Sequence, residues 1–295
     1  MTATLDAIAR PSGALAMVAM DQRESLRTMY AGAGCGRPDD ATLVHFKLEV
    51  AKALGPLASG FLIDRHYGFD AVRDQHLLPA STGLILAADE LTQADGGPVE
   101  ETALDPVVIH DDFDLSGVAA LKLLIIWRRD DKREERVRLA EEFIRVAAAR
   151  GVLSVLEPVV RATRSELDAG TWDTDVAIRE AAAELSALAP SLYKVQVPLG
   201  GDGSEQDQRR ASVELGRVIT GPWVVLSQGV PLDRFLPAVV AACRAGASGF
   251  LAGRALWSDV VGAADPAAAL REHSVPRLER LAAAVDAEAR PWSQA

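Results

Sequence analysis

Short apolar runs alternate along this chain with longer stretches in which apolar residues recur at helical spacing. The apolar runs are continuous rather than alternating, which is typical of strands covered on both faces in a parallel sheet. They predict eight strands: Leu15–Met20, Gly60–Ile63, Leu84–Ala88, Leu121–Trp127, Val152–Leu156, Leu192–Val197, Trp223–Leu226 and Gly249–Ala252.

The stretches between these runs predict helices. Gly151 and Gly246 follow two of them and are typical helix stops, and Asp233 is a plausible N-cap. The predicted helices are Ala41–Leu54, Lys132–Arg150, Asp173–Leu188, Glu205–Ile219 and Asp233–Arg244, with a closing helical segment at Ala264–Ala289.

Alternation of strand and helix indicates βα units. Eight such units in 295 residues favour one (β/α)8 TIM barrel over residues 1–295, with a short N-terminal extension and a C-terminal closing helix. A doubly wound open sheet is the alternative. It would carry a glycine-rich turn after its first strand, and Met20–Arg23 contains no glycine.

Two segments between predicted elements are rich in turn-forming residues. Ala94–Pro106 is expected to form a loop or partial lid, and Leu199–Ser204 follows the sixth strand. Long loops at the catalytic face of a barrel often gate a site, although plain connectors fit these segments equally well.

Charge and composition exclude several classes of function. The net charge of −11 opposes binding to nucleic acid. No apolar run is long enough to cross a bilayer, and Met1–Pro11 lacks the pattern of a secretory signal, so a cytoplasmic location is expected. The two cysteines, Cys35 and Cys243, show no spacing typical of a metal site or a disulfide framework.

Lys194 stands inside a predicted buried strand, where an ammonium group is costly. Burial favours the neutral amine of a lysine, and a neutral amine in a pocket attacks carbonyls to form a Schiff base. The alternative is a strand-end lysine whose ammonium reaches solvent. Active sites of (β/α)8 barrels lie at the C-terminal ends of the strands, which favours the catalytic interpretation.

Two further residues are expected beside Lys194. Lys122, in the fourth strand, would favour the neutral form of Lys194 by charge repulsion. Glu157 follows the strand between them and is a candidate proton shuttle, or else the partner of either lysine in a structural ion pair.

The ends of strands seven and eight resemble an anion-binding cradle. Gly229 and Gly253 allow backbone N–H groups to approach an oxyanion, Ser227 adds a hydroxyl and Arg254 a guanidinium. Phosphate sites in barrels recur after these two strands. Turn glycines and a surface arginine are the alternative explanation.

Several strand-end motifs, in order along the chain, resemble the class I aldolases that include tagatose 1,6-bisphosphate aldolase and 6-deoxy-6-sulfofructose-1-phosphate aldolase. The likeness runs from about Ala14 to Val261 and is greatest to the sulfofructose-phosphate group. Its motifs are Ala19–Ser25, Ala120–Leu124, Ile126-Trp127-Arg128, Glu157–Arg161, Tyr193-Lys194-Val195 and Gly249–Trp257.

The resemblance implies Lys194 as the Schiff-base lysine, Glu157 as acid and base, and Lys122 as the neighbour that tunes it. Asp21 and Gln22 would hold substrate hydroxyls, while Ser227, Gly229, Gly253 and Arg254 would hold an anionic group. A second anion would face one of the strand-end arginines Arg23, Arg65 and Arg128.

The implied reaction is cleavage of 6-deoxy-6-sulfofructose 1-phosphate to dihydroxyacetone phosphate and sulfolactaldehyde, as in sulfoquinovose breakdown. It needs no cofactor and no metal, in keeping with five scattered histidines. Asp64–Tyr67, Gln196 and Gln228 depart from the sulfofructose-phosphate pattern, so a tagatose or fructose 1,6-bisphosphate aldolase of the same mechanism remains an alternative.

A barrel that binds a sugar phosphate without chemistry is a more remote alternative, because it leaves the paired lysines and the glutamate without a role. In every case the expected partner is a small anionic sugar phosphate, with no nucleic acid and no membrane. A homo-oligomer is also expected, and a neighbouring subunit would then be a further source of arginines at the barrel mouth.

Overall fold

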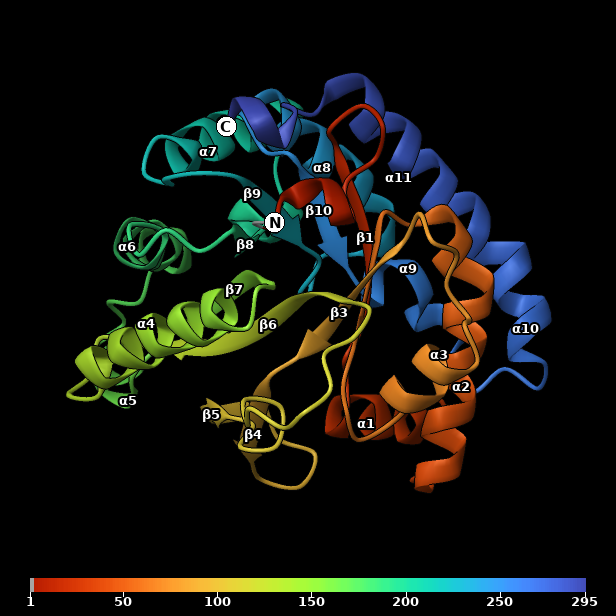
Figure 1. The fold of residues 1–295 in the computed structure, drawn as a ribbon. Helices are drawn as coiled ribbons and strands as arrows, with labels where there is room; N and C mark the ends of the chain where they lie inside the picture. Colours follow the sequence, from red (N-terminus) through yellow and green to blue (C-terminus); the bar gives the residue numbers. More distant parts are fainter. Residues whose placement is uncertain (1–2) are drawn as a thin grey trace.

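Eight parallel strands close into a barrel in the computed structural model, which describes residues 3–295 (Figure 1). Around the ring the strands follow the order β1, β10, β9, β8, β7, β6, β3, β2, and closure excludes the open-sheet alternative. The barrel strands are β1 Leu15–Met20, β2 Gly60–Ile63, β3 Gly83–Ala87, β6 Val118–Trp127, β7 Leu153–Val160, β8 Leu192–Gln196, β9 Trp223–Leu226 and β10 Gly249–Ala252.

Helices surround this ring, and the TIM-barrel prediction is confirmed. No helix of the described residues is both long and apolar enough to cross a membrane. The helices are α1 Glu24–Gly32, α2 Asp40–Leu54, α3 Phe69–Asp74, α4 Arg133–Ala149, α5 Arg164–Ala169, α6 Thr174–Ser186, α7 Glu205–Gly216, α8 Leu232–Arg244, α9 Arg254–Trp257, α10 Pro266–Ala269 and α11 Val275–Glu288.

Two strands are longer than their apolar runs suggested. β6 begins at Val118, three residues early, and β7 continues through Glu157 and Pro158 to Val160. The two pair along eight consecutive residues, from Ala120–Leu153 to Trp127–Val160. Glu157 therefore lies inside β7 and does not follow it, because the backbone pairing with β6 continues beyond this polar residue.

The segment expected to be a loop is partly a β-hairpin. Strands β4 (Asp89–Gln93) and β5 (Val99–Leu104) form a separate antiparallel pair. Asp89 and Glu90, which directly follow the predicted third strand Leu84–Ala88, begin β4. β5 contains three consecutive polar residues, Glu100–Thr102, and only Leu104 of this strand is buried, so a search for continuous apolar runs overlooks it.

Helix boundaries differ from prediction mainly where the segments are short or interrupted. α1 and α3 were not predicted, because each is under three turns long. Asp233 lies in the first turn of α8, whose N-cap is Pro231. The closing segment breaks into α10, a π-helical turn at Leu270–Ser274 and α11, which has a proline in its first turn.

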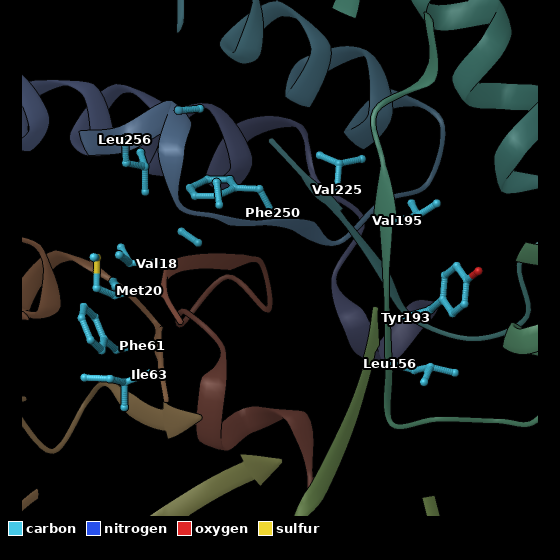
Figure 2. Close-up of a cluster of buried hydrophobic side chains, with 14 of the residues drawn as sticks. Val18, Met20, Phe61, Ile63, Leu156, Tyr193, Val195, Val225, Phe250 and Leu256 are labelled. Atoms are coloured by element: carbon cyan, nitrogen blue, oxygen red, sulfur yellow. The ribbon is translucent and has the colours of Figure 1, made fainter. Parts of the chain in front are cut away.

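Alternation along each barrel strand separates two apolar cores. Residues such as Leu15, Met17 and Ala19 fill the inside of the barrel. Their neighbours Val18 and Met20 pack outward with Phe61, Ile63, Tyr193 and Phe250 against the helices (Figure 2). Because the side chains alternate, each strand presents every second residue to the barrel interior at its C-terminal end.

Candidate active site

Polar residues replace apolar ones in the inward-facing positions nearest the C-terminal ends of the strands. On β6 the inward residue after Ala120 is Lys122, on β7 the residue after Val155 is Glu157, and on β8 the residue after Leu192 is Lys194. β7 and β8 pair Val155 with Leu192 and Leu156 with Tyr193. The next step of this register brings Glu157 beside Lys194.

Glu157 lies between the two lysines. Its Oε1 is 2.9 Å from Nζ of Lys194, and its Oε2 is 2.9 Å from Nζ of Lys122. All three side chains are less than a tenth exposed. The Oε2 contact lacks hydrogen-bond geometry among the described residues, so this oxygen has a lone pair free for a proton.

Lys122 is held as a cation. Its Nζ also lies 2.7 Å from Oδ2 of Asp21 and 3.1 Å from Oδ2 of Asp89. Burial opposes the charged form of this lysine, but the surrounding carboxylates of Asp21, Asp89 and Glu157 outweigh burial and raise the pKa of Lys122 well above its usual value. An ammonium so stabilised is not a nucleophile.

Asp21 shows the reciprocal effect. Burial would raise its pKa, but the charges of Lys122 and Lys194 and the hydrogen bond from Lys122 outweigh burial and lower the pKa of Asp21 far below its usual range. Asp21 is therefore a permanent carboxylate, suited to accept hydrogen bonds and poorly suited to act as a base.

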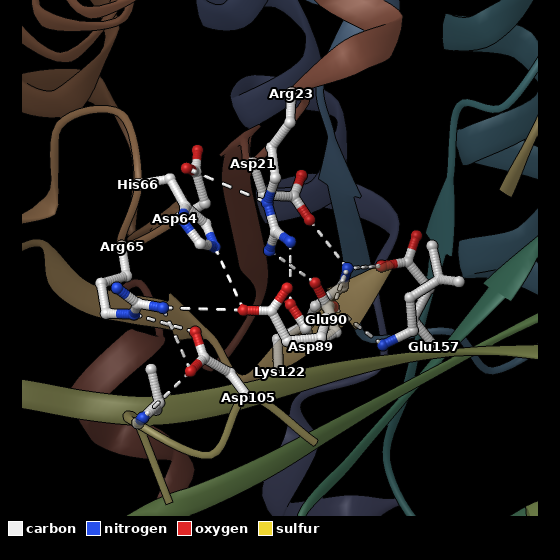
Figure 3. A network of polar contacts seen from close by, with 12 residues as sticks. Asp21, Arg23, Asp64, Arg65, His66, Asp89, Glu90, Asp105, Lys122 and Glu157 are labelled. Carbon is white, nitrogen blue, oxygen red and sulfur yellow. Dashed lines mark hydrogen bonds and ion pairs between the residues drawn. The ribbon is translucent and has the colours of Figure 1, made fainter. Parts of the chain in front are cut away.

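The ion pairs continue away from Lys122 in an alternating chain (Figure 3). Nη2 of Arg23 lies 2.7 Å from Oδ1 of Asp89, and Nε of Arg23 is 3.9 Å from Asp64. Asp64 in turn pairs with Lys47 of α2, and both side chains are fully buried. Opposite charges thus compensate one another from Lys194 down to α2.

A cavity of about 760 Å³ opens above the lysines, bounded on one side by the tip of the β4–β5 hairpin. Most of the residues predicted from the sequence to act in the site line it together: Asp21, Gln22, Arg23, Lys122, Glu157, Lys194, Ser227, Gly229, Gly253 and Arg254.

The two glycines of the predicted anion cradle are required for different reasons: Gly253 by close packing and Gly229 by its backbone conformation. A Cβ on Gly253 would lie 2.7 Å from the backbone oxygen of Ala19 and 2.8 Å from Nε2 of Gln22. Gly229 has a φ of +73°, which favours glycine. The hydroxyl of Ser227 accepts a hydrogen bond from the N–H of Ala255 at 3.4 Å.

The three arginines predicted as candidates for a second anion each pair with a carboxylate of the protein. Arg23 is bound to Asp89, and Arg65 lies 2.9 Å from Asp105. Arg128 pairs with Glu100, donates to its backbone oxygen at 2.9 Å, and is not among the cavity-lining residues. Their carboxylate partners, most of them on β4 and β5, were not apparent because the hairpin was not predicted.

Two residues that line the cavity or contact its lining were not assigned a role from the sequence. Asp89 anchors both Lys122 and Arg23, and it lies two positions after inward-facing Ala87 of β3. Arg161 lines the cavity directly after β7, four positions beyond Glu157. In both cases the sequence contained a usable signal. Side chains alternate between the two faces of the preceding strand, and continuing that alternation past the apolar run places each residue on the inward face.

One cluster has the residue types of a metal site. Ligand atoms of His66, Glu90 and Asp105 lie within 4.8 Å of one another. However, the guanidinium of Arg65 is 2.9 Å from Asp105 and 3.6 Å from Glu90. A cation already compensates these carboxylates, so the cluster fits an ion-pair network better than a metal centre.

Comparison with known proteins extends these observations. Residues 15–259 match the DeoC/LacD family aldolase model. Tagatose 1,6-diphosphate aldolase of Streptococcus agalactiae serotype V is 24% identical over 286 residues, covering 87% of this chain and 85% of its own. Tagatose 1,6-diphosphate aldolase 2 of Streptococcus pyogenes serotype M3 is 25% identical, covering 96% of this chain and 94% of its own.

Solved structures share the fold at lower identity. Fructose-bisphosphate aldolase from Plasmodium falciparum superposes with a TM-score of 0.69 at 14% identity, covering 98% of this chain and 99% of its own. An archaeal fructose 1,6-bisphosphate aldolase gives 0.64 at 16% identity, covering 96% and 98%. Since the family match spans most of the barrel, the chain belongs to the DeoC/LacD family of class I aldolases, which are carbon–carbon lyases.

Proposed function

We propose that Lys194 is the Schiff-base lysine of this aldolase and that Glu157 carries its protons. One observation supports the assignment above all others. Of the two lysines that line the cavity, Lys122 lies within 3.1 Å of three carboxylates, whereas Glu157 is the one carboxylate within 4.0 Å of Lys194 in residues 3–295. Lys194 is the lysine that can lose its proton without leaving several buried carboxylates uncompensated.

The first stage forms an iminium. Glu157 takes a proton from the ammonium of Lys194, and the neutral amine attacks the C2 ketone of a ketose phosphate. The carbinolamine hydroxyl then leaves as water after taking that proton from Glu157. Glu157 reaches Lys194 through Oε1 at 2.9 Å, which is the distance that proton transfer requires. The ammonium of Lys122 steadies the same carboxylate through its other oxygen.

The second stage breaks the C3–C4 bond. Glu157, now a carboxylate, takes the proton of the C4 hydroxyl, and the bonding electrons move into the iminium to give an enamine and an aldehyde. The proton now on Glu157 passes to C3 of the enamine. Hydrolysis of the resulting iminium releases dihydroxyacetone phosphate and restores the ion pair of Lys194 and Glu157. Asp21 and Gln22 hold substrate hydroxyls during these steps, since both line the cavity beside Lys122 and Asp21 stays ionised.

The proposed substrate is 6-deoxy-6-sulfofructose 1-phosphate, cleaved to dihydroxyacetone phosphate and sulfolactaldehyde. The strand-end motifs that resemble the sulfofructose-phosphate aldolases support it, as does the cradle of Ser227, Gly229, Gly253 and Arg254 for one anionic group. Tagatose 1,6-bisphosphate is the second candidate, favoured by the names of the streptococcal relatives.

Borohydride trapping tests the catalytic lysine. The purified protein is treated with dihydroxyacetone phosphate and borohydride and then mapped by peptide mass spectrometry. We expect a reduced adduct on the peptide that carries Lys194 and none on the peptide that carries Lys122. An adduct on Lys122 would reverse their roles, and a protein without any adduct would fit the binding-only barrel.

Substrate preference is tested separately, in EDTA. We expect kcat/KM for sulfofructose 1-phosphate to exceed the values for fructose and tagatose 1,6-bisphosphate by roughly a hundredfold, or about 2.7 kcal/mol in transition-state binding. Comparable turnover of the bisphosphates would refute the sulfonate assignment while leaving Lys194 in its role.

A further inference from the structure

Arg161 is an arginine of the cavity wall that lacks a carboxylate partner. Arg23, Arg65 and Arg128 all form ion pairs with Asp or Glu within 4.0 Å, whereas none is found for Arg161 in residues 3–295. Its Nε is buried and makes no hydrogen bond within that range. A buried donor left unsatisfied is costly, so its persistence at a cavity indicates a group that arrives with the ligand.

The backbone fixes where this side chain starts. Arg161 immediately follows β7, and its N–H continues the ladder by donating to the oxygen of Trp127 at 2.9 Å. Arg161 lies an even number of positions after Val155 and Glu157, so it faces the barrel interior as they do. It lines the same cavity as Lys194. The guanidinium is therefore presented to the mouth from a rigid element.

Arg161 and the predicted anion cradle lie on opposite sides of Lys194 around the ring. The barrel order runs β10, β9, β8, β7. β9 and β10 lead into the cradle of Ser227 and Arg254, β8 carries Lys194, and β7 leads into Arg161. A ketose whose C2 sits at Lys194 would extend its C1 phosphate toward the cradle and its far end toward Arg161.

We propose that Arg161 binds the second anionic group of the substrate, the tetrahedral oxyanion carried by C6. The inference rests on the proposed aldol cleavage at Lys194. A guanidinium matches such an oxyanion in charge and through its paired N–H donors.

The local charges agree with this role. Burial lowers the pKa of Arg161. Glu100 opposes that shift, while the positive charges of Arg128 and Arg254 add to it. An anion placed against Arg161 would offset both the burial and the repulsion.

Three substrates that differ only at C6 test the assignment: sulfofructose 1-phosphate, fructose 1,6-bisphosphate and fructose 1-phosphate, whose C6 is uncharged. We expect Arg161→Gln to lower kcat/KM by about 10- to 100-fold for the first two, the range of a lost charged hydrogen bond, and by less than about threefold for fructose 1-phosphate. The loss should fall mainly on KM. Arg161→Lys should recover part of it.

A matched control is available three residues away. Arg164 is exposed and pairs with Asp168 on α5, so Arg164→Gln should leave all three values unchanged. Thermal unfolding of each variant checks that it is folded. Equal losses on all three substrates, or no loss on any, would overturn the role of Arg161.

Trapping with dihydroxyacetone phosphate separates the two proposals. This ligand has no C6, so Arg161→Gln should form the borohydride adduct on Lys194 as readily as the wild type does. If Arg161→Gln is trapped normally and still prefers substrates with an anionic C6 group as the wild type does, the role of Arg161 is refuted and the Schiff-base proposal stands. Absence of trapping in the wild type refutes the Schiff-base proposal and the inference with it.

Discussion

Two lysines of the same barrel differ because of what surrounds each ammonium group. Lys122 and Lys194 both face the interior, and both are almost completely buried. Three carboxylates hold Lys122 as a cation, whereas Lys194 pairs with one carboxylate of the described residues, that of Glu157. The two lysines have the same residue type and similar burial. The charged groups around each ammonium therefore decide which lysine is suited to act as a nucleophile.

The depressed pKa of Asp21 makes a prediction about acid stability. Because folding lowers the pKa of this carboxyl, its stabilising contribution is complete above the unfolded pKa of about 4 and is lost as the pH falls through the folded value. We expect Asp21→Asn to be less stable than the wild type by a constant amount between pH 7 and 5. The gap should narrow below about pH 4.

Urea unfolding from pH 7 to pH 3 measures this gap. Asp131→Asn, at an exposed position, should follow the wild type throughout. A gap for Asp21→Asn that stays constant to the lowest pH would contradict the pKa shift.

At the scale of elements, the helix α2 is tied to the strand β2 by a buried charge pair. Lys47 of α2 reaches Asp64, which follows β2 and also accepts the N–H of Tyr67 at 2.9 Å. Burial lowers the pKa of Lys47 even though Asp64 opposes the shift. This pair extends the ion network of the site into the layer between sheet and helix, so packing of the helix and geometry of the site are linked.

Removal of Lys47 should be costly. Lys47→Met leaves Asp64 buried with its charge less compensated, and we expect a loss of about 3–5 kcal/mol in the free energy of unfolding. Lys52→Met, on the same helix at an exposed site beside Glu49, should change it by less than about 0.5 kcal/mol.

A double-mutant cycle with Asp64→Asn isolates the pair. The double variant should lose less than the sum of the two single losses, because Lys47 and Asp64 act on each other. Additive losses would show that the cost of Lys47→Met comes from packing alone.

At the scale of the whole molecule, the two ends of the barrel differ: one end holds the cavity, and the other end is covered by a short helix. The cavity lies at the C-terminal ends of the strands, while the short helix Trp292–Gln294 covers the other end. There the N–H of Trp292 donates to the oxygen of Gly13 at 3.0 Å, and its ring packs against the inner core.

Trp292→Ala should therefore affect stability and not chemistry. We expect a loss of about 2 kcal/mol, below the value for a fully buried tryptophan because the ring is only partly buried. Borohydride trapping and kcat/KM should stay within twofold of the wild type. A large loss of activity at a temperature where the variant is folded would show that the two ends are coupled.

The sequence by itself determined the eight strands, the alternation with helices and the residues Lys122, Glu157 and Lys194. These features are local: apolar runs reveal buried strands, and a charged residue within or directly after such a run is conspicuous wherever the strand lies. The strand-end motifs likewise indicated an aldolase before any geometry was known.

Only the tertiary structure decided which charges compensate one another. Asp21 and Lys122 are 101 positions apart, yet they meet at 2.7 Å across the barrel. The unpredicted hairpin supplies Asp89 and Glu100 as partners for Arg23 and Arg128. Arg161 has no carboxylate within 4.0 Å in the part of the chain that the structure describes. Ion pairing depends on distances fixed by closure of the ring, and sequence spacing does not carry that information.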